Sequence, residues 1–222
     1  MTPGLARALE AAREQGFLGD GPVEGHIEHA IGFATAVEDV LGVAPSAFLD
    51  LGSGGGVPGL VLAARWSEAE ATLLDANRSR CRVLQAAAHD LGFEHRIRVL
   101  CLRAEEAGRD PGLRSSQPVV VARSFGAPAV TAECGGPLLQ VGGLLVVAEP
   151  PGPVPTRGGQ VGHPGRWPEE PLAELGLAPL RFWFDQAGYQ VLRQLRPCPA
   201  RYPRRVGIPE KRPLYRCANW ST

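Results

Sequence analysis

The sequence predicts an α/β fold: a seven-stranded, mostly parallel sheet with helices on both faces and a β-hairpin near its C-terminal end. Short apolar runs alternate with helical patterns from residue 47 to residue 148. A glycine-rich turn, Gly52–Gly59, joins the first of these runs to a helical segment. Two further apolar and aromatic runs flank a short turn near residue 186, which is typical of a hairpin.

Each element has its own local signal. Gly16 and Gly42 can end two N-terminal helices, and Asn77 can cap a long helix that Gly92 ends. The run Val119–Ala122 is wholly apolar, as expected of a strand buried on both faces. Helices are expected at residues 3–15, 23–41, 59–66, 77–91, 128–139 and 169–175. Strands are expected at residues 47–51, 71–75, 97–102, 119–122, 144–148, 180–184 and 189–195.

The chain of 222 residues is long enough for one domain with a full apolar core. We expect N-terminal helices in residues 1–43 and the sheet domain in residues 44–216. Residues 149–168 are rich in proline and glycine, which predicts a mobile loop. Residues 196–216 form a basic tail, in which seven cations stand against one acid, Glu210.

Composition argues against several classes of protein. Hydrophobic residues make up 44% of the chain, yet no apolar run approaches the ~20 residues of a membrane-spanning helix. The first residues lack the apolar stretch of a secretory signal, so we expect a cytoplasmic protein without membrane contact. The five cysteines are scattered, and we expect His26 and His29 to be exposed or to cap a helix, so no metal site is expected. The formal net charge is zero, so the chain as a whole is not an obvious nucleic-acid binder. The clustering of arginine in the tail is the feature that indicates binding of nucleic acid.

The glycine-rich turn predicts a nucleoside site. Glycines alternate in Asp50-x-Gly52-x-Gly54-x-Gly56, where the absence of Cβ atoms lets a ligand approach the backbone. Asp75 ends the next apolar run, at a distance typical of an acid that binds ribose hydroxyls. Asp50 would repel a diphosphate and suits a ligand with a cationic tail. We therefore expect S-adenosylmethionine, which has a sulfonium, an amine and a ribose but no phosphate. A turn that only packs strand against helix is the alternative.

Other motifs accompany this turn. They are Arg103-Ala-Glu-Glu106, Val121-Ala-Arg-Ser124, Pro137-Leu-Leu-x-x-Gly-Gly143 and Tyr202-Pro-Arg-Arg-Val-Gly-Ile-Pro-Glu-Lys-Arg-Pro-Leu214. Together with the turn and Asp75, they resemble the bacterial ribosomal RNA small subunit methyltransferase G family over residues 44–214. The resemblance implies a Rossmann-like class I methyltransferase that uses S-adenosylmethionine to methylate N7 of one guanine in 16S ribosomal RNA.

The resemblance also implies site residues. Cofactor-binding residues would be Asp50, Gly52, Ser53, Gly54, Gly56, Val57, Asp75, Ala104, Glu105 and Arg123. Arg123 would lie at both the cofactor and the guanine, and Arg103 would also help to position the reactants. Ala104, Glu105 and Arg123 follow predicted strand ends, where open α/β sheets bind ligands. A solvated loop acid is the alternative for Glu105, and a structural ion pair is the alternative for Arg123.

The chain also departs from the family pattern. The family's Asn-Leu-Thr stretch is missing, and its His-x-x-Asp-Ser-Leu motif corresponds to His26–Ala30 without the Asp and Ser. Where the family usually has Lys-Gly after the fifth strand, this chain has Glu149-Pro150. These departures favour a small-molecule acceptor as one alternative, and a non-catalytic RNA-binding protein is another.

The implied chemistry fits the absence of a catalytic triad. Guanine N7 carries an unprotonated lone pair, so its methylation needs no general base. We expect catalysis by in-line positioning of the reactants and by exclusion of water. The expected partner is 16S ribosomal RNA or the small ribosomal subunit, whose phosphates would meet Arg201, Arg204, Arg205 and Lys211. The alternative for this proline-rich tail is a rigid strap packed on the sheet.

Overall fold

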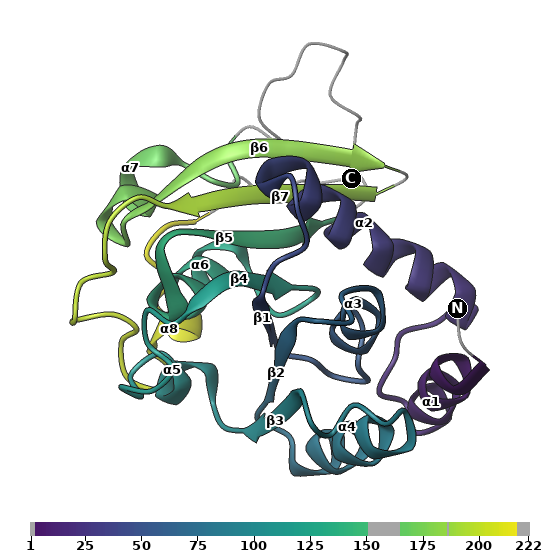
Figure 1. Cartoon of the computed structure of the whole chain (residues 1–222). Coiled ribbons are helices and arrows are strands. Elements are labelled where there is room, and N and C mark those ends of the chain that lie inside the picture. Colours follow the sequence, from purple (N-terminus) through teal and green to yellow (C-terminus); the bar gives the residue numbers. More distant parts are fainter. Residues whose placement is uncertain (1–2, 151–164, 186, 217–222) are drawn as a thin grey trace.

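The structure, a computed structural model, describes residues 3–150, 165–185 and 187–216. The strands are β1 (Ala47–Leu51), β2 (Glu70–Asp75), β3 (Ile97–Cys101), β4 (Gln117–Ala122), β5 (Leu139–Glu149), β6 (Leu177–Asp185) and β7 (Ala187–Gln194). They form one seven-stranded sheet with the order β3-β2-β1-β4-β5-β7-β6 (Figure 1). The strand number and the final hairpin confirm the prediction from the sequence.

All neighbours from β3 to β5 run parallel, and β7 runs antiparallel to both β5 and β6. Asp50 lies opposite Leu73 on one side and Val121 on the other. The parallel register brings the carboxyl ends of β1, β2, β3 and β4 to one edge of the sheet, where the loops that follow can build a common site.

Helices cover both faces of the sheet (Figure 1). One apolar cluster contains side chains from α1 (Pro3–Glu14), α2 (Val23–Leu41), α3 (Gly59–Arg65) and α4 (Arg78–Asp90). The opposite cluster contains side chains from α5 (Ala104–Ala107), α6 (Pro128–Gly135), the 3-10 turn η1 (Gly136–Leu138) and α7 (Glu169–Glu174). Successive residues of the strands contribute side chains to the two clusters in alternation. Val119 and Val121 belong to the first cluster, and Val120 belongs to the second. A final short helix, α8 (Ile208–Lys211), lies in the tail.

The main differences from the predicted elements have local causes. The helix predicted over 128–139 ends at Gly135, because Gly136-Pro137 continues as a 3-10 turn and β5 already begins at Leu139. The four-residue helices α5 and α8 are too short to show a period in the sequence. Asn77 caps α4 as predicted, because its side chain accepts from the N–H groups of Ser79 and Arg80.

Three further expectations concern a mobile loop, membrane-spanning helices and metal sites. Most of the predicted mobile loop, residues 151–164, lies outside the described residues. None of the described helices has both the length and the apolar character to cross a membrane. Among the described residues, no group of three or more histidine, cysteine, aspartate or glutamate side chains is arranged to hold a metal ion.

Candidate active site

The turn after β1 adopts a backbone that favours glycine. The φ angle is 77° at Gly52, 55° at Gly54 and 98° at Gly56, which residues with a Cβ atom rarely adopt. A Cβ atom at Gly52 would lie 2.7 Å from the ring of Phe125, so Phe125 packs directly on the backbone of the turn. The hydroxyl of the buried Ser53 donates to the carbonyl of Asp50 at 3.0 Å and closes the turn from within.

Asp50 is fully buried behind this turn. Its Oδ2 accepts from the N–H of Gly59 at 2.9 Å, whereas its Oδ1 has no hydrogen-bond partner among the described residues. Burial raises the pKa of Asp50 to about 7, and the N–H of Gly59 opposes that rise. An unbonded buried carboxylate oxygen is unfavourable, and a nearby cation would stabilise the ionised form. Asp50 therefore fits a ligand with a cationic part, such as S-adenosylmethionine.

Asp75 joins two strand ends. Its Oδ2 accepts from the N–H of Gly54 at 2.9 Å, and its Oδ1 accepts from the N–H of Asn77 at 2.8 Å. The side chain is almost fully buried, and the guanidinium of Arg80 lies 3.8 Å away. Because each carboxylate oxygen can accept more than one hydrogen bond, Asp75 keeps capacity for ligand hydroxyls.

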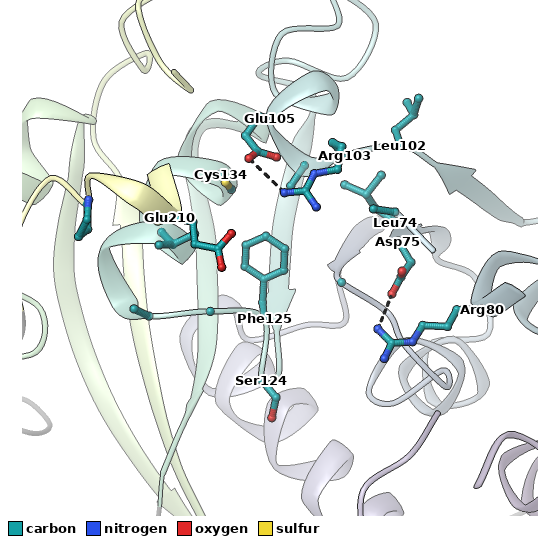
Figure 2. A pocket seen from close by; sticks show the side chains of 17 residues that line it. Leu74, Asp75, Arg80, Leu102, Arg103, Glu105, Ser124, Phe125, Cys134 and Glu210 are labelled. Carbon is teal, nitrogen blue, oxygen red and sulfur yellow. Dashed lines mark ion pairs between the residues drawn. The ribbon is translucent and has the colours of Figure 1, made fainter. Parts of the chain in front are cut away.

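A cavity of about 550 Å³ lies at the carboxyl ends of β1, β2, β3 and β4. Figure 2 shows the side chains that line it and the ion pairs that Asp75 and Glu105 form with arginines. The cavity brings together these predicted residues: Gly52, Asp75, Arg103, Ala104 and Glu105. The other predicted residues of the turn, namely Asp50, Ser53, Gly54, Gly56 and Val57, do not line it.

Glu105 connects this cavity to the basic tail. Its side chain is almost fully buried, and its Oε1 accepts from the N–H of Gly207 at 2.9 Å. The same oxygen lies 3.5 Å from Nη2 of Arg103, the residue before α5. Glu210 and Pro213 from the tail also line the cavity. The tail therefore forms one wall of the site as well as carrying charge.

Arg123 lines a second cavity, of about 400 Å³, which shares Ser124, Phe125 and Gly126 with the first. Its Nη2 lies 2.7 Å from Nδ1 of His26. The expectation that His26 would be exposed or would cap a helix was wrong: only 7% of it is exposed, and its ring nitrogens contact Arg123 and the carbonyl of Gly19.

Glu149, at the end of β5, also lines the second cavity. Its buried carboxylate accepts from Nε of Arg166 and, at 2.7 Å, from Nε1 of Trp167. An acid at the position of the family's lysine is thus paired with an arginine from farther along the chain. A cation is therefore present at this strand end, from a residue that local sequence could not connect to it.

The structure gives Arg204 a different role from the phosphate contact that the sequence suggested. Its Nε and Nη2 donate to the carboxylate of Glu133 at 2.8 and 2.6 Å, and its backbone N–H adds a third bond at 2.8 Å. Glu133 is fully buried in α6, and Arg204 also donates to the carbonyl of Arg212. Arg204 is thus a structural anchor, whereas Arg201, Arg205 and Lys211 are exposed.

Sequence reasoning missed Arg114, a second anchor of the tail. Its guanidinium donates to four carbonyl groups, those of Gly108, Cys198, Pro199 and Tyr202, at 2.6 to 3.1 Å. Three of these carbonyls lie more than 80 residues away in sequence, so no local pattern announces them. By contrast, Leu102 is the last residue of a predicted strand and Phe125 closely follows another, so the rule for strand ends could have placed them in the site.

Solved structures share this fold. A Klebsiella pneumoniae protein assigned as an O-methyltransferase superposes with a TM-score of 0.59 at 14% identity, covering 88% of this chain and 91% of that one. An Escherichia coli protein assigned as a methyltransferase superposes with a TM-score of 0.52 at 16% identity, covering 76% of this chain and 87% of that one. The fold is therefore the Rossmann-like fold of class I methyltransferases, as predicted.

Sequence comparison narrows this class to one family. A profile of the rRNA small subunit methyltransferase G family matches residues 24–149. Ribosomal RNA small subunit methyltransferase G of Synechococcus sp. (strain RCC307) is 34% identical over 184 residues, which cover 77% of this chain and 71% of that protein. The namesake protein of Deinococcus deserti is 35% identical over 170 residues, covering 75% and 68%. The chain belongs to the rRNA small subunit methyltransferase G family.

Proposed function

We propose that this protein is an S-adenosylmethionine-dependent methyltransferase that modifies N7 of a guanine in 16S ribosomal RNA. One observation carries the proposal: in a chain of this family, Asp75 lines a cavity at the carboxyl ends of four parallel strands. Relatives that cover most of the chain are named as methyltransferases of the small subunit's ribosomal RNA, which favours an RNA acceptor over a small molecule.

The residues divide the work of holding the cofactor. Asp75 would accept from the ribose hydroxyls, while Ala104 and Glu105 would face the adenine. The ionised Asp50 would stabilise the cationic amino-acid part from behind the turn. The backbone of Gly52, Ser53, Gly54, Gly56 and Val57 shapes this cradle. When bound, S-adenosylmethionine supplies the methyl group that is transferred.

The acceptor would approach from the second cavity, which adjoins the first at Ser124, Phe125 and Gly126. Because guanine N7 is unprotonated at neutral pH, no residue has to remove a proton before methyl transfer. Arg123 and Arg103 would orient the reactants, and Phe125 and Trp167 would exclude water.

The RNA would be held by exposed cations of the tail, namely Arg201, Arg205 and Lys211. They belong to the same segment as Glu210 and Pro213, which line the first cavity. Phosphates bound to this segment would therefore lie near the mouth of the site. The substrate would be 16S ribosomal RNA or the small subunit, in the cytoplasm.

Transfer of radiolabelled methyl groups to small subunits and to naked 16S RNA tests this proposal, with nucleoside mass spectrometry to identify 7-methylguanosine. We expect labelled 7-methylguanosine with the wild type. Asp75→Ala should weaken S-adenosylmethionine binding about tenfold or more, because a charged hydrogen bond contributes roughly 1.5–3 kcal/mol. Asp90→Ala, which removes an exposed acid at the end of α4, is the matched control and should bind normally. Cofactor binding without methylation of any RNA would refute the proposed acceptor.

A further inference from the structure

Arg123 stands out because its charge has no carboxylate partner. It follows β4, is half-buried at the second cavity, and forms no ion pair within the described part of the chain. Burial lowers its pKa, and the charges of Tyr189 and then Asp50 only partly oppose that effect. A partly desolvated guanidinium that faces a cavity is suited to an anionic group of a ligand, and a carboxylate matches its planar donors.

The imidazole of His26 holds this guanidinium from the other side. A guanidinium can only donate hydrogen bonds, so Nδ1 of His26 must be the acceptor in the 2.7 Å contact with Nη2 of Arg123. Nε2 of His26 lies 3.0 Å from the carbonyl of Gly19, which can only accept. The two contacts together require the tautomer with its hydrogen on Nε2.

The segment that contains Gly19 also touches the glycine-rich turn. A Cβ atom at Gly55 would lie 2.8 Å from the carbonyl oxygen of Phe17 and 2.8 Å from the side chain of Leu18. The loop between α1 and α2 therefore packs on the cofactor cradle and, through Gly19 and His26, also sets the position of Arg123. These contacts connect the glycine-rich turn to Arg123.

His29, which lies at the same cavity as Arg123, does not neutralise it either. Burial, followed by the charge of Arg123, lowers the pKa of His29 to about 4, so His29 is uncharged near neutral pH. His29 and Arg123 line the same cavity. The positive charge of Arg123 is thus available to a ligand, and the hydrogen bond to His26 holds the guanidinium in place.

We propose that His26 is a positioning residue for the cofactor: it holds Arg123 so that the guanidinium binds the carboxylate of the amino-acid part of S-adenosylmethionine. This inference rests on the proposed function, because it requires that cofactor. It gives the N-terminal helices a role in ligand binding, with Asp50 and Arg123 matching the opposite charges of one zwitterionic group.

Two amide substitutions separate the two contacts of His26. In His26→Asn, the side-chain oxygen can replace Nδ1 as the acceptor for Arg123, while the contact with Gly19 is lost. In His26→Gln, the amide nitrogen can replace Nε2 and donate to Gly19, while the acceptor for Arg123 is lost. We expect calorimetric affinity for S-adenosylmethionine to fall at least tenfold in His26→Gln and to stay within about threefold of wild type in His26→Asn.

A second ligand distinguishes positioning from a general structural role. 5′-Methylthioadenosine lacks the amino-acid part, so both variants should bind it as tightly as the wild type does. Equal losses for both ligands, or equal affinities of the two variants for S-adenosylmethionine, would overturn the inference while leaving the proposed function intact. A wild-type protein that binds neither ligand would overturn both.

A double-mutant cycle covers the case in which His26→Gln lowers stability. In an Arg123→Ala background, adding His26→Gln should cause no further loss of S-adenosylmethionine affinity, because the residue acts through Arg123. Thermal melting of each free variant shows whether it is folded at the temperature of the titration. Additive losses in the cycle would contradict the role of His26.

Discussion

The glycine-rich turn and the basic tail both contain motifs of the family, yet they use their polar residues differently. In the turn, Asp50 and Asp75 accept hydrogen bonds from backbone N–H groups of nearby segments. These bonds fix the positions of the two acids and the conformation of the turn together. In the tail, neighbouring cations have opposite roles: Arg204 is bound to the buried Glu133, whereas Arg205 is exposed. Motif membership therefore predicts the position of a residue in both regions, but in the tail it does not show whether a cation is bound to a buried acid or exposed.

The difference arises from the range of the interactions. The shape of a turn between a strand and a helix depends on local backbone conformation. Glycine and aspartate residues in the sequence indicate that conformation. The tail is fixed by contacts between distant segments, such as the four carbonyl groups bound by Arg114. Whether an arginine meets water or a buried acid is then decided by the fold.

Removing each of the two neighbouring arginines in turn tests whether their roles differ. Arg204→Ala leaves the carboxylate of Glu133 buried without its cation, which costs about 3 kcal/mol of unfolding free energy. Arg205→Ala removes an exposed side chain and should change the unfolding free energy by less than about 0.5 kcal/mol. Urea unfolding at neutral pH measures both. Similar values for the two variants would mean that Glu133 does not depend on its partner.

The second test concerns the exposed cations of the tail. Single-stranded RNA gives a log–log salt slope of about −0.7 per neutralised phosphate, so alanine at Arg201, Arg205 and Lys211 should flatten the slope by about 2. Between 50 and 200 mM salt, that difference corresponds to about twentyfold in relative RNA affinity. Filter binding of 16S RNA fragments across this range measures the slope, and S-adenosylmethionine affinity should stay at the wild-type value. An unchanged slope would mean that these cations do not bind RNA phosphates and that the tail has only a structural role.

Most of the fold could be predicted from the sequence, because its signals are short-range. The bounds of α2 and β1 and the cap at Asn77 follow from periodicity, apolar runs and stop residues. The sequence predicts that this strand begins at residue 144, five residues after the observed start of β5, because Gly142 and Gly143 resemble a turn between elements. In the structure, both glycines lie within that strand, and Gly142 adopts a φ angle of 86°.

The candidate site was predictable at the strand ends and less so elsewhere. Asp75, Ala104 and Glu105 line the cavity because they end β2 or closely follow β3. The contact between His26 and Arg123 joins residues 97 positions apart, and that between Glu149 and Arg166 depends on how the chain returns to the sheet. Such pairs need three-dimensional information, since neither partner has a local reason to be there.

The pKa of Asp50 provides a test of the turn itself. With a pKa near 7, this carboxyl group is mostly protonated at pH 6 and mostly ionised at pH 8. A cationic ligand favours the ionised form, so affinity for S-adenosylmethionine should rise from pH 6 to pH 8, by at most about tenfold. Asp50→Asn keeps an acceptor for the N–H of Gly59 but cannot ionise, so this rise should disappear and the affinity at pH 8 should be lower. Calorimetry at three pH values measures the effect. A rise that persists in Asp50→Asn would assign the titration to another group and would leave Asp50 with only its role in shaping the turn.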